Sequence, residues 1–308
     1  MAKQKSDAGV AVAQPDPSRT SGLFDGSRPL QLFLEHLPLM RHGMAECGAA
    51  AFPFSALNAL PKIALNKWGI WPVDGACLVG AGLDLRVIPT GDREAYYGAV
   101  MDQLAKNCPV PTVPQWLADH LKKTFTVKKQ QVEYLMKTDD VITPPGSRHS
   151  RLRNYLRIAD RECVAEEFDP AQHLAEYLHL NRTWYRQNAD LKFRTYDKTS
   201  IDWLLDNWQD VQKAIPDARC VGIRLRHTAQ LIAFDMGCLL TNDQWTSYTH
   251  RFDRNASVNR VSMFAYAELA KLYPACPTEN QGTADTTTIK AWKERLAYAT
   301  QTLFTVSR

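Results

Sequence analysis

The chain has 308 residues, of which 45% are hydrophobic and 23% are charged, and its formal net charge is +4. This composition is that of a globular protein, and the length is enough for two domains of ordinary size, each with its own core. No apolar run approaches the roughly 18 residues that a membrane-spanning helix needs, and the mildly basic charge permits an anionic partner without requiring one.

The first half of the chain predicts helices around a small group of strands. Residues 1–29 are rich in polar residues, Gly and Pro, and predict a disordered tail. Apolar residues at helical spacing predict a helix that begins at Pro29 and two more at 93–106 and 113–122. Alternating or continuous apolar runs predict strands at 68–71, 76–79, 83–89 and 124–127. Gly80-Ala81-Gly82 predicts a hairpin turn between the second and third strands.

Pro144-Pro145-Gly146 predicts a domain boundary, because two prolines and a glycine stop any regular element. We therefore expect one domain at 30–145 and a second at 146–308. The second domain has predicted helices at 148–161, 170–187 and 200–214 and then a predicted antiparallel meander at 220–225, 230–239 and 245–250. A helix at 258–273, a polar loop at 279–285, a short helix and a strand at 303–306 follow. This order predicts an α+β fold with a mixed sheet, and the first half shows a shorter version of it.

The seven cysteines are scattered along the chain and include no Cys-x-x-Cys pair. A disulfide framework or a zinc ribbon needs paired, closely spaced cysteines, so we expect reduced, buried thiols and no metal site. Lys3 and Lys5 are not followed by an apolar stretch, and no secretory signal is predicted. These features predict a cytoplasmic protein.

The predicted helix at 148–161 is strongly basic. Arg153, Arg157 and Arg161 are spaced four residues apart and so share one face. The planar guanidinium group donates two hydrogen bonds at once to a phosphate, which makes such a stripe suited to a nucleic-acid backbone. The alternative is a solvated helix face, which charge runs usually are.

The predicted strands of the second domain carry two candidate groups for chemistry. Tyr248 and His250 occupy alternate positions and are expected to share one face with Thr246, where His250 could act as a general base. Asp235 lies inside an otherwise apolar strand, a placement that costs free energy unless the carboxylate is paired. The alternatives are a hydrogen-bonded histidine at a strand end and a carboxylate on the wet face of an edge strand.

Several short stretches together resemble one family of known proteins. They are 55–68, 132–135, 150–154, 230–237, 243–248, the loop 279–285, and Trp292-Lys293. In this order and spacing the chain resembles the soluble C-terminal domain (DUF2156) of bacterial phosphatidylglycerol lysyltransferases, in which the acyltransferase fold of the GNAT superfamily is used twice in tandem. The resemblance implies two tandem GNAT-like domains, with the active site in the C-terminal one.

The resemblance also implies a reaction. It implies a transferase that moves an aminoacyl group from aminoacyl-tRNA, as a co-substrate, to a small-molecule, peptide or lipid head-group acceptor. No other cofactor, no transmembrane segment and no stable nucleic-acid complex is required. The expected substrate-binding residues are Arg153, Asn154, Arg157, Asp235, Tyr248, Glu279 and Trp292.

Four residues are expected to be catalytic. Acyl transfer from an ester needs a positive or hydrogen-bonding environment for the carbonyl and a group that takes the acceptor's proton. Lys293 could stabilise the carbonyl or the terminal phosphate, Asp285 could hold the α-ammonium group, and Asn280 could orient the substrate, beside His250 as base. The alternative is that Asn280 and Asp285 shape a turn and that the Lys293 stem packs with its ammonium group in water.

Two other functions stay open at this stage. An acyl-CoA-dependent N-acyltransferase normally has a glycine-rich turn whose backbone amides hold the pyrophosphate. The equivalent stretch here, Phe252 to Val258, contains no glycine, which counts against CoA. The third possibility is a non-catalytic binding protein that keeps the GNAT fold.

Overall fold

The computed structural model describes residues 27–188, 198–283 and 287–308, so that most of the predicted tail lies outside the described part of the chain. The helices are α1 (Arg28–Cys47), α2 (Ala56–Ala64), α3 (Arg93–Ala105), α4 (Gln115–Leu121), α5 (Thr138–Ile142), α6 (Ser150–Glu162), α7 (Pro170–Gln187), α8 (Lys198–Asp206), α9 (Trp208–Ala214), α10 (Val261–Ala270) and α11 (Thr287–Leu296). The strands are β1 (Gly69–Val73), β2 (Ala76–Gly80), β3 (Arg86–Pro89), β4 (Val110–Pro114), β5 (Thr126–Lys137), β6 (Cys163–Glu167), β7 (Arg219–Leu225), β8 (Leu231–Leu239), β9 (Gln244–Phe252), β10 (Thr278–Asn280) and β11 (Ala299–Ser307).

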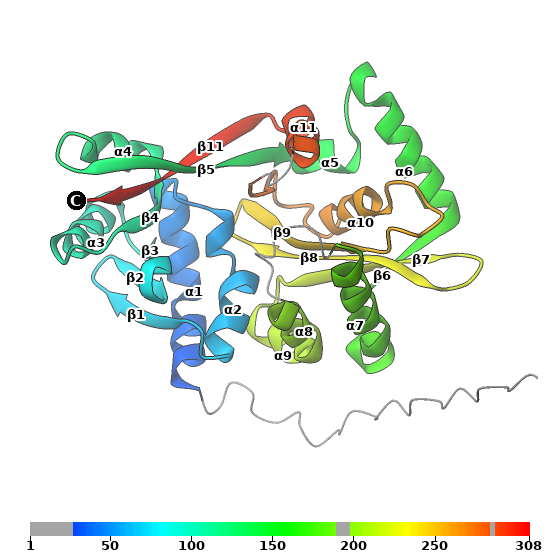
Figure 1. Cartoon of the computed structure of the whole chain (residues 1–308), viewed down its shortest axis with the longest axis horizontal. Helices are drawn as coiled ribbons and strands as arrows, with labels where there is room; N and C mark the ends of the chain where they lie inside the picture. The colour runs from blue at the N-terminus through cyan, green and yellow to red at the C-terminus, as the bar shows by residue number, and fades with distance from the viewer. Residues whose placement is uncertain (1–26, 189–197, 284–286) are drawn as a thin grey trace, which may run out of the picture.

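The described strands form two sheets (Figure 1). Strands β1, β2 and β3 make an antiparallel sheet, and the others make a mixed sheet in the order β4-β11-β5-β10-β9-β8-β7-β6. Strands β9 and β10 run parallel in this larger sheet. The prediction of a mixed-sheet fold is therefore confirmed. Both predicted domains contribute strands to the larger sheet, and the boundary at residue 145 stays a prediction.

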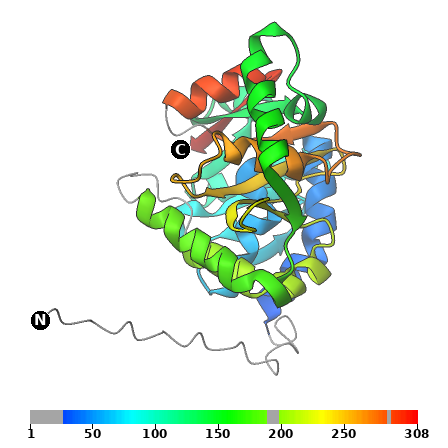
Figure 2. The same cartoon turned by 90° about the vertical axis from the view of Figure 1, so that its right-hand side faces the viewer.

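Helices cover both faces of the larger sheet. Helices α2, α7, α8 and α9 lie against one face, and α5, α6, α10 and α11 lie on the other side (Figure 1). Figure 2 looks toward the β6 edge, where α6 and α7 stand on opposite sides of the sheet. The largest core fills the first side and includes Leu57, Tyr177, Trp208, Phe234 and Met236, all at most 1% exposed. This core makes β8 a central, doubly covered strand.

The C-terminal strand β11 lies between two strands of the first half. It pairs antiparallel with β5 over its whole length and with β4 through Leu303, Phe304 and Val306. Val306 is fully buried in a second, smaller core that α3 and α4 cover, together with Val113 and Leu117. The two halves of the chain are therefore joined by strand pairing as well as by packing.

Local sequence signals explain several element ends. The Asp169 carboxylate accepts a hydrogen bond from the Ala171 amide, and Pro170 occupies the first turn, so that α7 begins where predicted. Gly48 ends α1 with a left-handed φ of 57°. The hairpin turn between β2 and β3 uses Gly80 and Gly82 with positive φ. These ends need no distant partner, and the start of α7 and the turn between β2 and β3 were predicted.

Parts of three predicted elements were wrong. Residues 113 and 114, expected to begin a helix, form the end of β4, because β11 supplies a partner strand that local patterning does not reveal. The helix expected at 200–214 is divided, because the Asn207 side chain bonds the Trp203 carbonyl and ends α8. The polar loop expected at 279–285 begins as a strand, since Glu279 and Asn280 pair with β5.

Candidate active site

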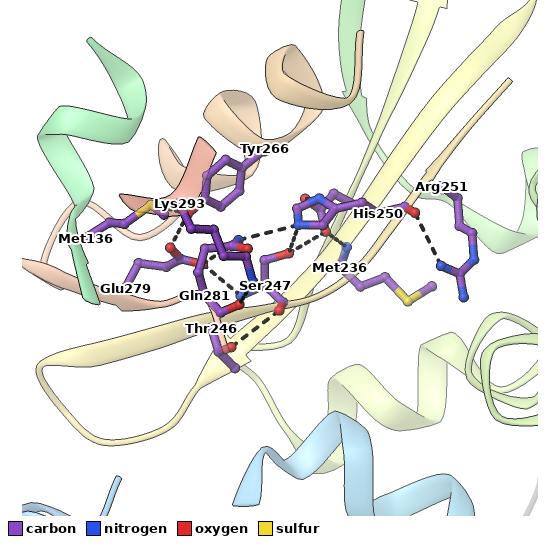
Figure 3. A network of polar contacts seen from close by, with 11 residues as sticks. Met136, Met236, Thr246, Ser247, His250, Arg251, Tyr266, Glu279, Gln281 and Lys293 are labelled. Carbon is purple, nitrogen blue, oxygen red and sulfur yellow. Dashed lines mark hydrogen bonds and ion pairs between the residues drawn. The ribbon is translucent and has the colours of Figure 1, made fainter. Parts of the chain in front are cut away.

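A polar cluster occupies the place where two parallel strands separate. Strands β9 and β10 pair only at Thr278 with Gln244 and at Glu279 with Trp245. Beyond this point β10 ends, whereas β9 continues to Phe252. Figure 3 shows that polar side chains from β9, β10, α10 and α11 meet beside the separation. Asp235 of β8 contacts Ser247 and His250 of this group. We call this set the splay cluster: Asp235, Ser247, His250, Tyr266, Glu279, Gln281 and Lys293.

A β-bulge in β9 decides which side chains reach the splay cluster. Met236 pairs with Thr249 but Gly237 pairs with Ser247, so Tyr248 is the extra residue. The bulge places His250 and Ser247 on the same face, where the Ser247 Oγ lies 3.3 Å from His250 Nε2. Tyr248 instead packs in the large core, stacked on Phe52. The prediction that Thr246, Tyr248 and His250 share a face was therefore wrong, because a period of two fails across a bulge.

Asp235 and His250 form a buried carboxylate–imidazole pair. The His250 Nδ1 lies 2.6 Å from the Asp235 Oδ2, across the β8–β9 pairing. Asp235 is fully buried on a central strand rather than on an edge, whereas 34% of the His250 side chain is exposed. Burial raises the pKa of Asp235, and the neighbouring His250 opposes that rise. The carboxylate thus lies against the Nδ1 side of a partly exposed imidazole.

Ser247 supports this pair rather than extending it. Its hydroxyl donates to the Asp235 Oδ1 at 2.8 Å, and the Met236 amide donates to the same oxygen at 2.8 Å. In a serine nucleophile triad the serine lies across the imidazole from the carboxylate. Here the serine contacts the carboxylate directly, so its position suits orienting Asp235 and not nucleophilic attack.

Glu279 is the second buried carboxylate of the splay cluster. The Tyr266 hydroxyl donates to its Oε2, while the Gln281 amide and the Ser247 backbone N–H donate to its Oε1 at 3.0 and 3.3 Å. Complete burial raises the pKa of Glu279 to about 7, against the opposing effects of Tyr266, the Ser247 amide, Lys293 and His250. This carboxyl group can therefore change its charge near neutral pH.

Lys293 reaches the same region from α11. It is 5% exposed, and its Nζ donates to the carbonyl oxygens of Gln281 and Thr283 at 2.5 Å each. The ammonium group is therefore buried against the backbone after β10, and it does not extend into water as one alternative supposed. Trp292 packs edge-on to Tyr266, with 5.8 Å between ring centroids.

Asn280 belongs to a neighbouring network. Its Nδ2 donates to the buried Glu133 carboxylate at 2.7 Å, and its Oδ1 accepts from the Gly282 amide at 2.8 Å. Gln301 of β11 also donates to Glu133, as does the Phe52 amide. Asn280 is fully buried, so in this structure it joins β10 to β5 and β11.

The basic residues of α6 lie apart from this polar network and play different parts. Arg153 donates to the carbonyl oxygens of Pro144 and Gly146 at 2.6 and 2.7 Å and so holds the turn before the helix. Arg157 is exposed and donates to Asn154 at 2.7 Å. Asp285, expected to bind the α-ammonium group, lies outside the described residues.

The structure thus brings together Asp235, His250, Glu279 and Lys293, while Tyr248 and Asn280 are buried in other contacts. Sequence reasoning did not single out Ser247, Tyr266, Gln281 or Glu133. Of these, Gln281 stands inside the Glu-Asn-Gln-Gly stretch and could have been selected as a buried amide near two titratable groups. Ser247 could not, because the bulge that exposes it to His250 has no sequence signature here.

Two further searches were negative within the described ranges. No helix among residues 27–188, 198–283 and 287–308 is long and apolar enough to cross a membrane. In the same described part of the chain, no three His, Cys, Asp or Glu side chains are grouped so that they could hold a metal ion.

Comparisons with known proteins give similarity at the level of structure. No protein-family model matches the chain, and no curated protein matches its sequence. A conserved protein of unknown function from Bacteroides thetaiotaomicron superposes with a TM-score of 0.73 at 13% identity, covering 89% of this chain and 97% of that one.

Two other solved structures carry informative names. The C-terminal domain (DUF2156) of a protein named as a lysylphosphatidylglycerol synthetase, from Agrobacterium fabrum, gives a TM-score of 0.59 at 12% identity and covers 87% of this chain and 92% of its own. FemX gives 0.59 at 11% identity, with 88% and 94% covered. The chain therefore has the GNAT-like fold shared by the lysylphosphatidylglycerol synthetase C-terminal domain and FemX.

Proposed function

We propose that this protein is an aminoacyltransferase that moves an aminoacyl group from aminoacyl-tRNA to the nucleophile of a small-molecule, peptide or lipid head-group acceptor. The observation that carries the proposal is the Asp235–His250 pair beside the splay of β9 and β10, with the imidazole partly exposed. The fold is one that a lysylphosphatidylglycerol synthetase and FemX share. The sequence resemblance implies aminoacyl-tRNA as the donor.

In the proposed reaction, His250 accepts a proton from the acceptor and later returns it to the leaving group. With the proton on Nδ1, whose nitrogen lies 2.6 Å from the Asp235 Oδ2, the His250 Nε2 is the nitrogen that can accept a proton. The acceptor's nitrogen or oxygen attacks the ester carbonyl carbon while its proton passes to Nε2. The bond between that carbon and the ribose oxygen of the tRNA then breaks, and His250 returns the proton to the ribose oxygen. Atoms and charge balance without a redox partner.

Charge on α6 supports an anionic donor. Arg151, Arg157 and Arg161 are exposed along this helix, and arginine suits phosphate contacts because it donates in pairs. Arg153 contributes indirectly, since it fixes the turn from which α6 begins. Asp285 remains the proposed partner of the donor's α-ammonium group.

The connection between β9 and α10 favours a donor other than CoA. Residues 253–260 contain no glycine, and Arg260 adopts a left-handed φ of 63° just before α10. Side chains at every position keep a pyrophosphate away from the backbone amides that a CoA-dependent enzyme would use. An acyl-CoA-dependent N-acyltransferase is therefore the weaker alternative.

The test is discharge of charged tRNA. Purified protein is incubated with total tRNA carrying labelled amino acids, with and without a cell extract that supplies acceptors, beside a separate acetyl-CoA binding titration. We expect protein-dependent loss of label, and we expect His250→Ala to slow that loss by about a hundredfold or more. His227→Ala, at an exposed turn, is the matched control and should discharge at the wild-type rate.

Two results would contradict the proposal. If His250→Ala discharges tRNA as fast as the wild type, the imidazole is not the base. If no label is lost even with extract present, the donor is wrong, and binding of acetyl-CoA would then favour the acyl-CoA alternative.

A further inference from the structure

The Gln281 side chain lies between the two titratable groups of the splay cluster. Its Nε2 donates to the Glu279 Oε1 at 3.0 Å and lies 3.4 Å from the His250 Nε2 (Figure 3). Gln281 is only 6% exposed. An amide nitrogen carries two hydrogens, so that one can serve the carboxylate while the other is directed at the imidazole.

The backbone holds this amide in place from three directions. The Gln281 N–H donates to the Tyr134 carbonyl at 3.0 Å, and the Gln281 carbonyl accepts from Lys293 Nζ at 2.5 Å. Gly282 follows with φ 62°, and a Cβ there would lie 2.9 Å from the Phe52 ring. With the main chain fixed on both sides, the position of the amide is determined by Glu279 and His250.

Glu279 sets which end of the amide faces the histidine. Once ionised, above its pKa of about 7, the Glu279 carboxylate only accepts hydrogen bonds, so the Gln281 –NH2 group and not its oxygen is then directed at it. The same nitrogen then points at His250 Nε2. A neutral imidazole with its proton on Nδ1 can accept there, whereas an imidazolium would place two N–H donors against each other.

We infer that Gln281 is a positioning residue that holds His250 in its neutral form, with the proton on Nδ1, and opposes uptake of a proton at Nε2. Lys293 takes part by fixing the backbone from which the amide projects. For proton uptake the amide has to turn so that its oxygen accepts from Nε2–H. The consequence for catalysis rests on the proposed function, because only a base uses this lone pair.

Several other groups lie around His250, each with its own contacts. Asp235 contacts Nδ1, Ser247 lies 3.3 Å from Nε2, and the Tyr266 ring meets the imidazole edge-on at 5.4 Å. Arg251 bonds the His250 carbonyl oxygen, and the charges of Glu279 and Lys293 lie on the far side of Gln281. These side chains are all kept in a Gln281 variant, in which Glu279 loses one donor and His250 loses its contact with the amide.

The test is an NMR titration of 15N-histidine-labelled full-length protein, which needs no substrate. His250 is assigned among the 8 histidines by comparison with a His250→Gln sample. In the wild type we expect the proton on Nδ1 near neutral pH. In Gln281→Met, which keeps an unbranched side chain, we expect the His250 titration midpoint to rise by about half to one pH unit, since losing one such hydrogen bond changes an equilibrium about three- to tenfold. Gln230→Leu, at an exposed position, should not move it.

The outcomes separate this inference from the donor proposal. A proton on the His250 Nε2 in the wild-type protein would overturn the inference. An unchanged His250 titration midpoint in Gln281→Met would overturn it as well. If that variant does not fold, Gln281→Leu supplies the same comparison. The expected shift without any tRNA discharge would leave the role of Gln281 in place and reject the proposed donor. Discharge of tRNA together with an unchanged His250 midpoint in Gln281→Met would support the proposed donor and reject the role of Gln281.

Discussion

Replacing Glu279 by glutamine should make the protein more resistant to alkaline conditions. The Glu279 carboxyl is fully buried, and burial raises its pKa from 4.5 to about 7. Because the folded-state pKa lies above the unfolded value, its contribution to stability is complete below about pH 4.5 and is lost as the pH rises through about 7. Glutamine keeps an oxygen for the Tyr266 hydroxyl without a charge.

The size of the effect follows from the shift. At 1.36 kcal/mol per pKa unit, linkage predicts that the free energy of unfolding of the variant gains about 2 to 3 kcal/mol on the wild type between pH 5 and pH 8. Urea unfolding at each pH measures this difference. Glu294→Gln is the control, because this carboxylate is 53% exposed and should give a constant difference. A constant difference for Glu279→Gln as well would refute the raised pKa.

Three further predictions concern the surroundings of the site. Lys293→Met should lower the free energy of unfolding by about 2 kcal/mol, because two buried carbonyls lose a charged donor. Lys290→Met, at an exposed position, should leave it unchanged. Equal urea midpoints for the two variants would contradict a stabilising role of the buried Lys293 ammonium group. Gly282→Ala should lower the free energy of unfolding by about 1 kcal/mol or more, because Gly282 has a left-handed φ and the Phe52 ring leaves no room for a Cβ. Gly98→Ala, in open space within α3, should raise it by about 0.5–1 kcal/mol, and thermal unfolding measures both changes. Replacing Arg151 and Arg157 by glutamine should reduce the slope of log affinity for tRNA against log salt by about one to two, and an unchanged slope would remove α6 from the binding surface.

Sequence patterns predicted the elements whose form depends on near neighbours. The bounds of α7 were predicted as observed because a strong apolar face coincides with Pro170 at its start. The meander of β7, β8 and β9 was predicted because β7 and β8 are apolar runs and turn residues separate the three strands. Strands β4 and β10 could not be predicted from local patterns. The last two residues of β4 were assigned to a helix, β10 is the short polar stretch Thr-Glu-Asn, and both strands pair with partners far along the chain.

The candidate site was predicted in its components and not in its arrangement. Asp235 and His250 were chosen from their strand positions and Glu279 and Lys293 from the family resemblance, and the structure places the four in one cluster. Their contacts depend on the bulge at Tyr248 and on the separation of β9 from β10. Both features arise from the way three strands fit together, and a period of two or 3.6 carries no information about them.

The position of β11 bears on how the chain folds. Its partners β4 and β5 are complete by residue 137, yet the pair cannot be bridged until residues 299–307 are made. Contacts such as Leu303 with Pro114 span most of the sequence, and such long-range pairing slows folding because a large loop must close first. Until then, facing edges of β4 and β5 are open to strands of other molecules. We therefore expect chains truncated before Ala299 to aggregate during refolding, at concentrations where the full chain recovers its native sheet.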